Sequence, residues 1–257
     1  MGPVGRDPMV VRVVPDSGVS FGKDEDEMKK AFPILGILTA ILLSYALYMA
    51  LVVAPTEQTM GDVQRIFYYH VPSAWTAFIL FTMNFVASLV YLARRKLAAD
   101  MVALVSAEVG VVFCTIVLVT GPIWARPVWG IWWTWDMRLT STLVLWLIYV
   151  SYLILRRFSA SGETPILAAA LAIFGALCVP FVYFSIWFFR TQHPQPVIGG
   201  GGSIDPRMLH VLLINWLAFS CLAFLICWSR YRLEKLQREV EQAQAFQSLT
   251  QSPRSPR

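Results

Sequence analysis

Three histidines and one tryptophan-rich stretch are the parts of this sequence best suited to chemistry. The histidines are His70, His193 and His210. The stretch, residues 124–141, reads WARPVWGIWWTWDMRLTS. It holds five of the chain's ten tryptophans, with one acid and two bases: Trp124, Trp129, Trp132, Trp133, Trp135, Asp136, Arg126 and Arg138. So many indoles in one connection indicate a surface for a flat, apolar ligand.

Long uncharged runs separate these residues. The chain is 57% hydrophobic and 14% charged, whereas soluble domains are about half apolar and about a quarter charged. Six runs are long enough to cross a bilayer as helices, which takes roughly 20 residues. They lie near 33–54, 73–93, 101–120, 139–155, 165–189 and 208–228. The sequence therefore predicts an all-α integral membrane protein with six transmembrane helices.

Lysine and arginine near the ends of the spans predict the orientation. Twelve of them flank one set of span ends and five flank the other. Basic residues collect on the cytoplasmic side of a membrane. Both termini are therefore expected in the cytoplasm. The connections at about 55–72, 121–138 and 190–207 are then expected on the outer face of the membrane.

The same reading divides the chain into three parts. We expect residues 1–32 to form a cytoplasmic, poorly ordered extension without a cleaved signal peptide. Residues 33–228 form the membrane domain, and its tryptophan-rich loop covers 121–141. Residues 229–257 form a cytoplasmic helix and tail, because Leu233, Leu236 and Val240 continue the helical spacing beyond the last span.

Haem fits the chemistry of these side chains. Its iron accepts two axial imidazoles, and its porphyrin packs against aromatic rings. His70 begins the second span and His210 the sixth from the same side, so the topology brings both to one membrane face. Arg65 and Arg138 are the candidate partners for the haem propionates. His193 is expected to be exposed in a loop rich in Gly and Pro.

Simpler interpretations of the same residues exist. Tryptophans form belts at membrane interfaces, and the five outside the stretch are scattered in that way, whereas five within twelve residues indicate a site. Trp129, Trp132, Trp133 and Asp136 would share one face of a short helix after Pro127. Asp136 either orients a nearby histidine or arginine, or begins the fourth span as a helix-start acid.

The segment WGIWWTWDMRLTS resembles the WWD signature of haem-handling membrane proteins of cytochrome c biogenesis. The segments RIFYYHVPSAW and VTGPIW, and a histidine at the start of the last span, make it similar to the CcmC family. The resemblance covers about 33–228. It implies that His70 and His210 are the axial ligands of haem b, carried as cargo, and that the tryptophan-rich loop covers the haem.

The resemblance also implies partners and a location. Haem would pass to the periplasmic chaperone CcmE, with help from the small subunit CcmD and the ATP-binding cassette pair CcmA and CcmB. The location would be the bacterial cytoplasmic (inner) membrane, in contact with lipid and with the site on the periplasmic side. The net charge of +5 gives no indication of nucleic-acid binding, because the basic residues lie mostly in short clusters between apolar runs.

Two other functions stay open at this stage. One is a cytochrome b-like electron-transfer protein, although such proteins usually hold haem on histidines within the spans. The other is a transporter of another amphipathic substrate. The sequence has no GxxxxGK[ST] phosphate loop, so we expect a binding and transfer protein and not an enzyme. Glu108, inside the third span, is expected to face the bundle, either protonated or paired with a polar group such as Asn84 or Asn215.

Overall fold

The computed structural model describes residues 21–158, 164–196 and 204–251, and in these ranges the named elements are all helices. They are α1 (Phe21–Tyr48), a π-helical turn η1 (Met49–Val53), a 3-10 turn η2 (Asp62–Ile66), α2 (Phe67–Arg94), α3 (Leu97–Trp129), α4 (Met137–Phe158), α5 (Thr164–Phe188) and α6 (Pro206–Gln251). Within the described ranges, six helices are long and apolar enough to cross a membrane. The predicted six-helix fold is confirmed.

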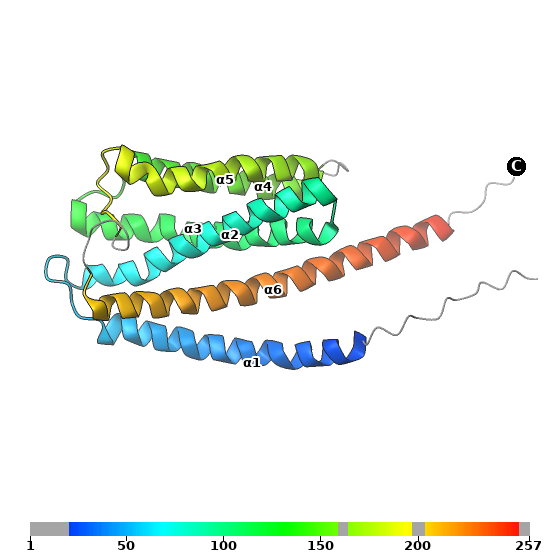
Figure 1. The fold of residues 1–257 in the computed structure, drawn as a ribbon, viewed down its shortest axis with the longest axis horizontal. Coiled ribbons are helices and arrows are strands. Elements are labelled where there is room, and N and C mark those ends of the chain that lie inside the picture. Colours follow the sequence, from blue (N-terminus) through cyan, green and yellow to red (C-terminus); the bar gives the residue numbers. More distant parts are fainter. Residues whose placement is uncertain (1–20, 159–163, 197–203, 252–257) are drawn as a thin grey trace, which may run out of the picture.

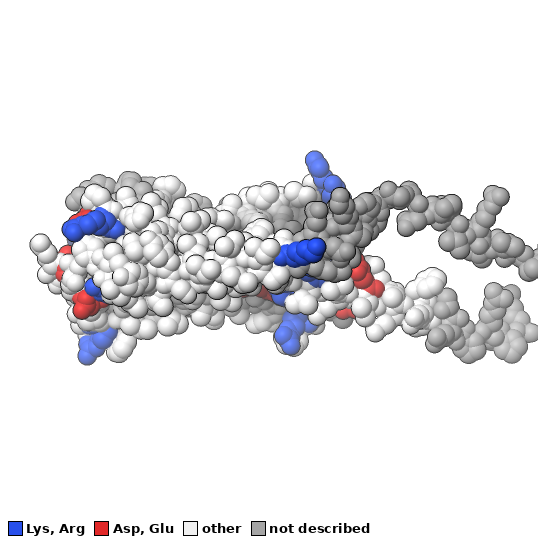
Figure 2. Space-filling view, turned by 90° about the horizontal axis from the view of Figure 1, so that it is seen from below, with Lys and Arg blue, Asp and Glu red and all other residues white. Residues whose placement is uncertain are grey.

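The helices run side by side along one long axis (Figure 1). The end of α1 and start of α2, the end of α3 and start of α4, and the end of α5 and start of α6 all lie at one end, called here the loop end. The start of α1 and the end of α6 lie at the other end, called here the opposite end. Charged side chains gather towards the two ends and leave an uncharged middle (Figure 2). The helix ends that border the three outward connections therefore lie together, as predicted, and residues 197–203 of the third connection lie outside the described ranges.

Several helices extend beyond the predicted spans, and α1, α3 and α6 do so furthest. Helix α1 begins at Phe21, so the described part of the expected N-terminal extension is helical, while residues 1–20 lie outside the described ranges. Helix α6 continues to Gln251, as expected for a helix beyond the last span, and residues 252–257 of the expected tail lie outside the described ranges. Helix α3 passes through Pro122 and Pro127 before it ends. Prolines are tolerated within membrane helices because neighbouring groups satisfy the freed backbone.

The end of α3 is set by Gly130. This residue has a φ of 79°, in the left-handed region, and its N–H donates to the carbonyl of Arg126 at 3.0 Å. Glycine is the usual residue for this helix end, because it has no Cβ to clash in that conformation. The chain leaves the helix there and runs without helical structure until α4 begins at Met137.

Helix α2 lies at the centre and packs against α3, α5 and α6, whereas α1 packs against α6. The rings of Phe81 and Tyr149 stack at 3.8 Å between centroids in the main core. A Cβ on Gly110 would lie 2.7 Å from Phe81 Cε1. The missing side chain therefore allows α3 to approach α2 closely, and this packing holds the start of α2 against the end of α3.

An ion-pair cluster joins α3, α4 and α6 towards the opposite end. It consists of Asp100, Glu108, Arg156, Arg230, Glu234 and Arg238. Asp100, with a side chain only 3% exposed, accepts hydrogen bonds from Arg156 at 2.8 Å and from Arg238 at 2.9 Å. The cluster ties the part of α6 beyond the last predicted span to the rest of the bundle.

Glu108 belongs to this cluster, so its expected partners were wrong. Its carboxylate pairs with the guanidinium of Arg230 at 2.8 Å. Asn84 instead donates to the carbonyl of Ala103, and Asn215 to those of Ala46 and Val211. Glu108 and Arg230 are far apart in the sequence, and they meet because α3 and α6 pack together.

Candidate functional site

His70 lies in the first turns of α2 at the loop end, where it faces α3. Its Nδ1 is 2.9 Å from the hydroxyl oxygen of Thr120. The position that a Cβ on Gly121 would occupy is 3.5 Å from His70 Cε1. The Nδ1–Cε1 edge of the ring is therefore turned towards the α3 backbone.

The structure places His193 beside His70. Their ring centroids are 6.4 Å apart, with an angle of 36° between the ring planes. The expectation of an exposed His193 was wrong, because its side chain is partly buried. A signal for this residue was available in the sequence: it follows the aromatic end of the fifth span directly, at the same face as His70.

His210 is placed differently. It lies in the second turn of α6 at the loop end, and its side chain is exposed. In the part of the chain that the structure describes, its ring makes no hydrogen bond and no aromatic contact. Both His70 and His210 lie at the predicted end of the molecule, but the contact the structure shows is between His70 and His193.

Asp136 joins the tryptophan-rich loop to the loop that carries His193. Its Oδ1 accepts the N–H of Leu139 at 2.9 Å, so it caps the start of α4. Its Oδ2 accepts the hydroxyl of Thr191 at 2.7 Å and the N–H of Gln192 at 3.3 Å. The structure therefore confirms Asp136 as a helix-start acid, and the same carboxylate also hydrogen-bonds the two residues just before His193.

The surroundings of His193 keep its imidazole neutral. Burial of the ring, followed by the positive charge of Arg138, lowers the pKa of His193 to about 4. Its Nδ1 lies 2.9 Å from the carbonyl oxygen of Pro194. Because a carbonyl can only accept, this Nδ1 carries the proton and Nε2 presents a lone pair. A neutral imidazole with a free Nε2 is the form that binds a metal ion.

The five tryptophans do not form one helical face. The hypothesis of a short helix after Pro127 was wrong, because α3 itself continues to Trp129 and residues 130–136 are not helical. Trp124 and Trp129 pack edge to face at the end of α3, with centroids 5.1 Å apart. Trp132 is exposed, and Trp133 packs edge to face with Trp135. The stretch therefore offers two separate indole pairs.

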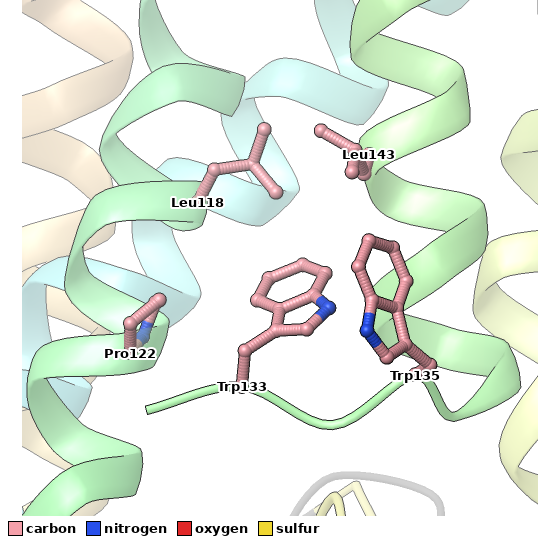
Figure 3. A pocket seen from close by; sticks show the side chains of 5 residues that line it. All are labelled: Leu118, Pro122, Trp133, Trp135 and Leu143. Atoms are coloured by element: carbon pink, nitrogen blue, oxygen red, sulfur yellow. The ribbon is translucent and has the colours of Figure 1, made fainter. Parts of the chain in front are cut away.

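The second pair lines an apolar pocket between α3 and α4 (Figure 3). The pocket has a volume of about 490 Å³, and its other lining residues are Leu118, Pro122 and Leu143. Trp135 is 76% exposed. The indole N–H of Trp133 is buried and, among the described residues, has no hydrogen-bond partner. A polar atom of a ligand could therefore accept from Trp133 within an otherwise apolar wall.

The arginines predicted to meet propionates already have protein partners. Arg65 donates to Asp62 at 3.0 Å and to the carbonyl of Ala50, within the π-helical turn η1, at 2.7 Å. Arg138 donates to two carbonyls of α5, those of Val182 and Tyr183, at 3.3 and 3.2 Å. Each arginine fixes one helix end to its neighbour, so a role towards a ligand would use the remaining N–H groups.

The side chains at the loop end suit a metal ion that is already bound to most of its ligands when it reaches the protein. In residues 21–158, 164–196 and 204–251, no three His, Cys, Asp or Glu side chains gather as a metal site. Two neighbouring imidazoles, an indole wall and nearby arginines match haem iron, whose four other ligands are porphyrin nitrogens. The residues present therefore fit haem.

Comparison with known proteins agrees with this fit. The CcmC family, described as heme exporter protein C, matches this chain over residues 24–246. The heme exporter protein C of Bradyrhizobium diazoefficiens is 35% identical over 222 residues, which cover 85% of this chain and 84% of that protein. The Haemophilus influenzae protein of the same name is 32% identical over 217 residues, 82% of this chain and 87% of that protein.

Similar proteins also occur in plants. A ccmC-like mitochondrial protein of cytochrome c biosynthesis from Marchantia polymorpha is 32% identical over 179 residues, which cover 69% of this chain and 76% of that protein. The family match, over residues 24–246, includes the loop end and nearly all of the six helices. The chain therefore belongs to the heme exporter protein C family, CcmC.

Proposed function

We propose that this protein binds haem at the loop end and passes it on during cytochrome c maturation. The family supports a role in haem handling. The single observation that carries the site is the contact between His70 and His193. Haem, in the b form, is the cargo and not a permanent cofactor.

The separation of the two rings suits one iron between them. A metal ion binds an imidazole nitrogen at about 2 Å, so two imidazoles that bind one ion from opposite sides would have ring centroids roughly 6 Å apart. The observed separation is 6.4 Å. We therefore assign His70 and His193 as the axial ligands. The pair predicted from the sequence, His70 with His210, is the competing assignment.

The indoles supply the apolar part of the site. A porphyrin is a wide, flat plate, and aromatic rings contact such a plate with large area at low entropic cost. Trp133 and Trp135 line the pocket between α3 and α4, and the unpartnered N–H of Trp133 can donate to a propionate. The loop that carries them is joined through Asp136 to the loop that carries His193. The plate and the iron are therefore held by connected segments.

A transfer protein must also release its cargo. Two axial imidazoles hold iron well, so we infer that a recipient replaces one of them during handover. His193 is the more replaceable ligand, because it lies on a loop whereas His70 lies on α2. The proposed recipient is the chaperone CcmE, with CcmD and the CcmA–CcmB pair as partners. The excess of Lys and Arg at the opposite end supports a periplasmic loop end in a bacterial cytoplasmic membrane.

Haem content and absorption spectra of the purified protein test the assignment. We expect His70→Ala and His193→Ala each to lose the spectrum of six-coordinate, two-imidazole haem, because each removes one iron ligand. His210→Ala is the matched control and should keep it. Loss in His210→Ala with retention in His193→Ala would favour the competing pair. If all three variants keep wild-type haem content and spectrum, the two-imidazole site is wrong.

A second measurement separates binding from delivery. Haem-loaded protein is mixed with purified CcmE, and haem on the chaperone is followed over time. We expect transfer from the wild type. A stable haem that never transfers, but is reduced by quinol, would support the electron-transfer function instead.

A further inference from the structure

Thr120 forms a short chain of hydrogen bonds with His70 and the α3 backbone. Its hydroxyl oxygen is 2.7 Å from the carbonyl oxygen of Ile116 and 2.9 Å from His70 Nδ1. Residue 120 lies one turn after residue 116 on α3, and His70 comes from α2. These hydrogen bonds therefore link the imidazole of His70 to α3, a helix that carries neither proposed iron ligand.

The geometry decides where the protons lie. A carbonyl oxygen cannot donate, and a threonine hydroxyl has only one proton to give. If that proton pointed to His70, the hydroxyl and carbonyl oxygens would face each other at 2.7 Å without a hydrogen between them. The favourable arrangement has Thr120 donating to Ile116. The Nδ1 of His70 then donates to Thr120.

We propose that Thr120 is the positioning residue that holds His70 in the Nδ1–H tautomer, with the Nε2 lone pair turned away from α3 and free for a ligand. The inference deepens the proposed function and rests on it for the identity of that ligand. A hydrogen bond to the second imidazole nitrogen fixes the ring orientation of a metal-binding histidine and raises its basicity. Here the acceptor is a neutral hydroxyl within a helix.

His193 reaches the same tautomer by another route. Its Nδ1 donates to the carbonyl of the adjacent residue, Pro194, at 2.9 Å. Both imidazoles at the site thus have Nδ1 engaged by the protein. The difference is that His70 depends on a side chain, so a substitution can remove its hydrogen bond.

The chain offers a matched control on the same helix. Thr115 donates to the carbonyl of Val111 at 2.7 Å and accepts the indole N–H of Trp146 at 2.8 Å. It repeats the arrangement of Thr120 more than one turn earlier on α3, with Trp146 of α4 as its donor. A Thr→Val change at either position keeps the shape and removes one hydroxyl.

The experiment measures the tautomer of His70 in haem-free protein in lipid bilayers. Histidine labelled with ¹⁵N is observed by solid-state NMR, and the His70 signal is assigned by its loss in His70→Gln. We expect the Nδ1–H tautomer in the wild type, in Thr120→Ser and in Thr115→Val. In Thr120→Val the tautomer should become mixed or reversed. Haem affinity of Thr120→Val should fall about 10- to 100-fold, as for other outer-shell partners of metal ligands, with rescue by Thr120→Ser.

The possible results of this experiment distinguish between support for the proposal and its rejection. An Nε2–H tautomer in the wild type overturns the proposal without any variant, even if Thr120→Val does not fold. An unchanged tautomer and affinity in a folded Thr120→Val also overturns it. Failure of the proposed function looks different, because the tautomer would depend on Thr120 as expected while neither His70→Gln nor Thr120→Val altered haem binding.

Discussion

The two ends of the helix bundle satisfy their charged groups in different ways. Towards the opposite end, acidic and basic side chains of α3, α4 and α6 bind one another. At the loop end, Arg65, Arg138 and Asp136 bind the backbone of neighbouring segments, and the ion pairs there, Arg65–Asp62 and Arg207–Asp205, each include an exposed side chain. One end is thus closed by pairs of charges. The other fixes its loops and leaves imidazoles and indoles available.

This difference indicates that stability depends mainly on the opposite end and ligand binding on the loop end. A buried charge that loses its partner is costly, so the ion-pair cluster locks the helices in one arrangement. Backbone bonds at the loop end hold segments in place without occupying the aromatic side chains. Substitutions at the two ends should therefore separate the two properties, which the following predictions test in order of decreasing effect.

The largest effect is expected for Asp100→Ala. This change removes the acidic partner of Arg156, whose side chain is 9% exposed, and one of the two acidic partners of Arg238. Breaking a buried pair in this way costs about 3–5 kcal/mol. Thermal unfolding in detergent should show the loss, while haem bound per folded molecule stays at the wild-type level. A variant with wild-type stability would show that the cluster does not hold the helices together.

The double substitution Trp133→Ala with Trp135→Ala should weaken haem binding and leave the folded protein intact. It removes the indoles that line the pocket between α3 and α4. We expect haem retention to weaken about tenfold, which corresponds to about 1.4 kcal/mol, and membrane insertion to stay unchanged. Haem titration and the amount of protein in the membrane measure the two quantities. Loss of insertion would mean that these indoles are structural. Trp228→Ala, at the opposite end, is the control.

Asp136→Ala should moderately reduce both the stability of the protein and its haem binding. Losing the cap of α4 costs about 1 kcal/mol. Freeing Thr191 and Gln192 should also displace His193 and weaken haem binding. Thr191→Val removes the hydroxyl that bonds Asp136 and the N–H of His193 but keeps the cap of α4, so it should weaken binding without the loss of stability. Equal stability losses in the two variants would contradict the separate roles of the two carboxylate oxygens.

The smallest effect is expected for Asp62→Ala. The pair of Asp62 with Arg65 is at the loop end, and its aspartate is 78% exposed. Exposed pairs contribute about 0–1 kcal/mol. Unfolding measurements should therefore place this variant close to the wild type, in contrast to Asp100→Ala. A loss of several kcal/mol would remove the distinction between the two ends.

The helices could be predicted from the sequence because hydrophobic runs of sufficient length specify them. The exact ends could not, and α3 shows why. Pro122 and Pro127 usually mark a helix end, yet here the helix continues past both. The helix ends because Gly130 adopts a left-handed backbone conformation, which a hydropathy pattern does not predict.

The site could be predicted as far as its end of the molecule. His70 and the tryptophans are recognisable by residue type and position. The approach of His193 is not, because it depends on Asp136 holding Thr191 and Gln192 across 55 and 56 residues of chain. The pairing of Glu108 with Arg230, across 122 residues, was missed for the same reason. Contacts between distant loops and helices require the packed structure.

Gly130 has a consequence for how this loop can change through evolution. No atom of the described residues lies within 4 Å of the place where its Cβ would be, so space permits a side chain and only the left-handed backbone opposes it. That opposition costs about 1–2 kcal/mol for most residues. A tryptophan beside it can be exchanged for another aromatic residue and keep a flat apolar surface. Gly130 should therefore change less often in evolution than the tryptophans around it.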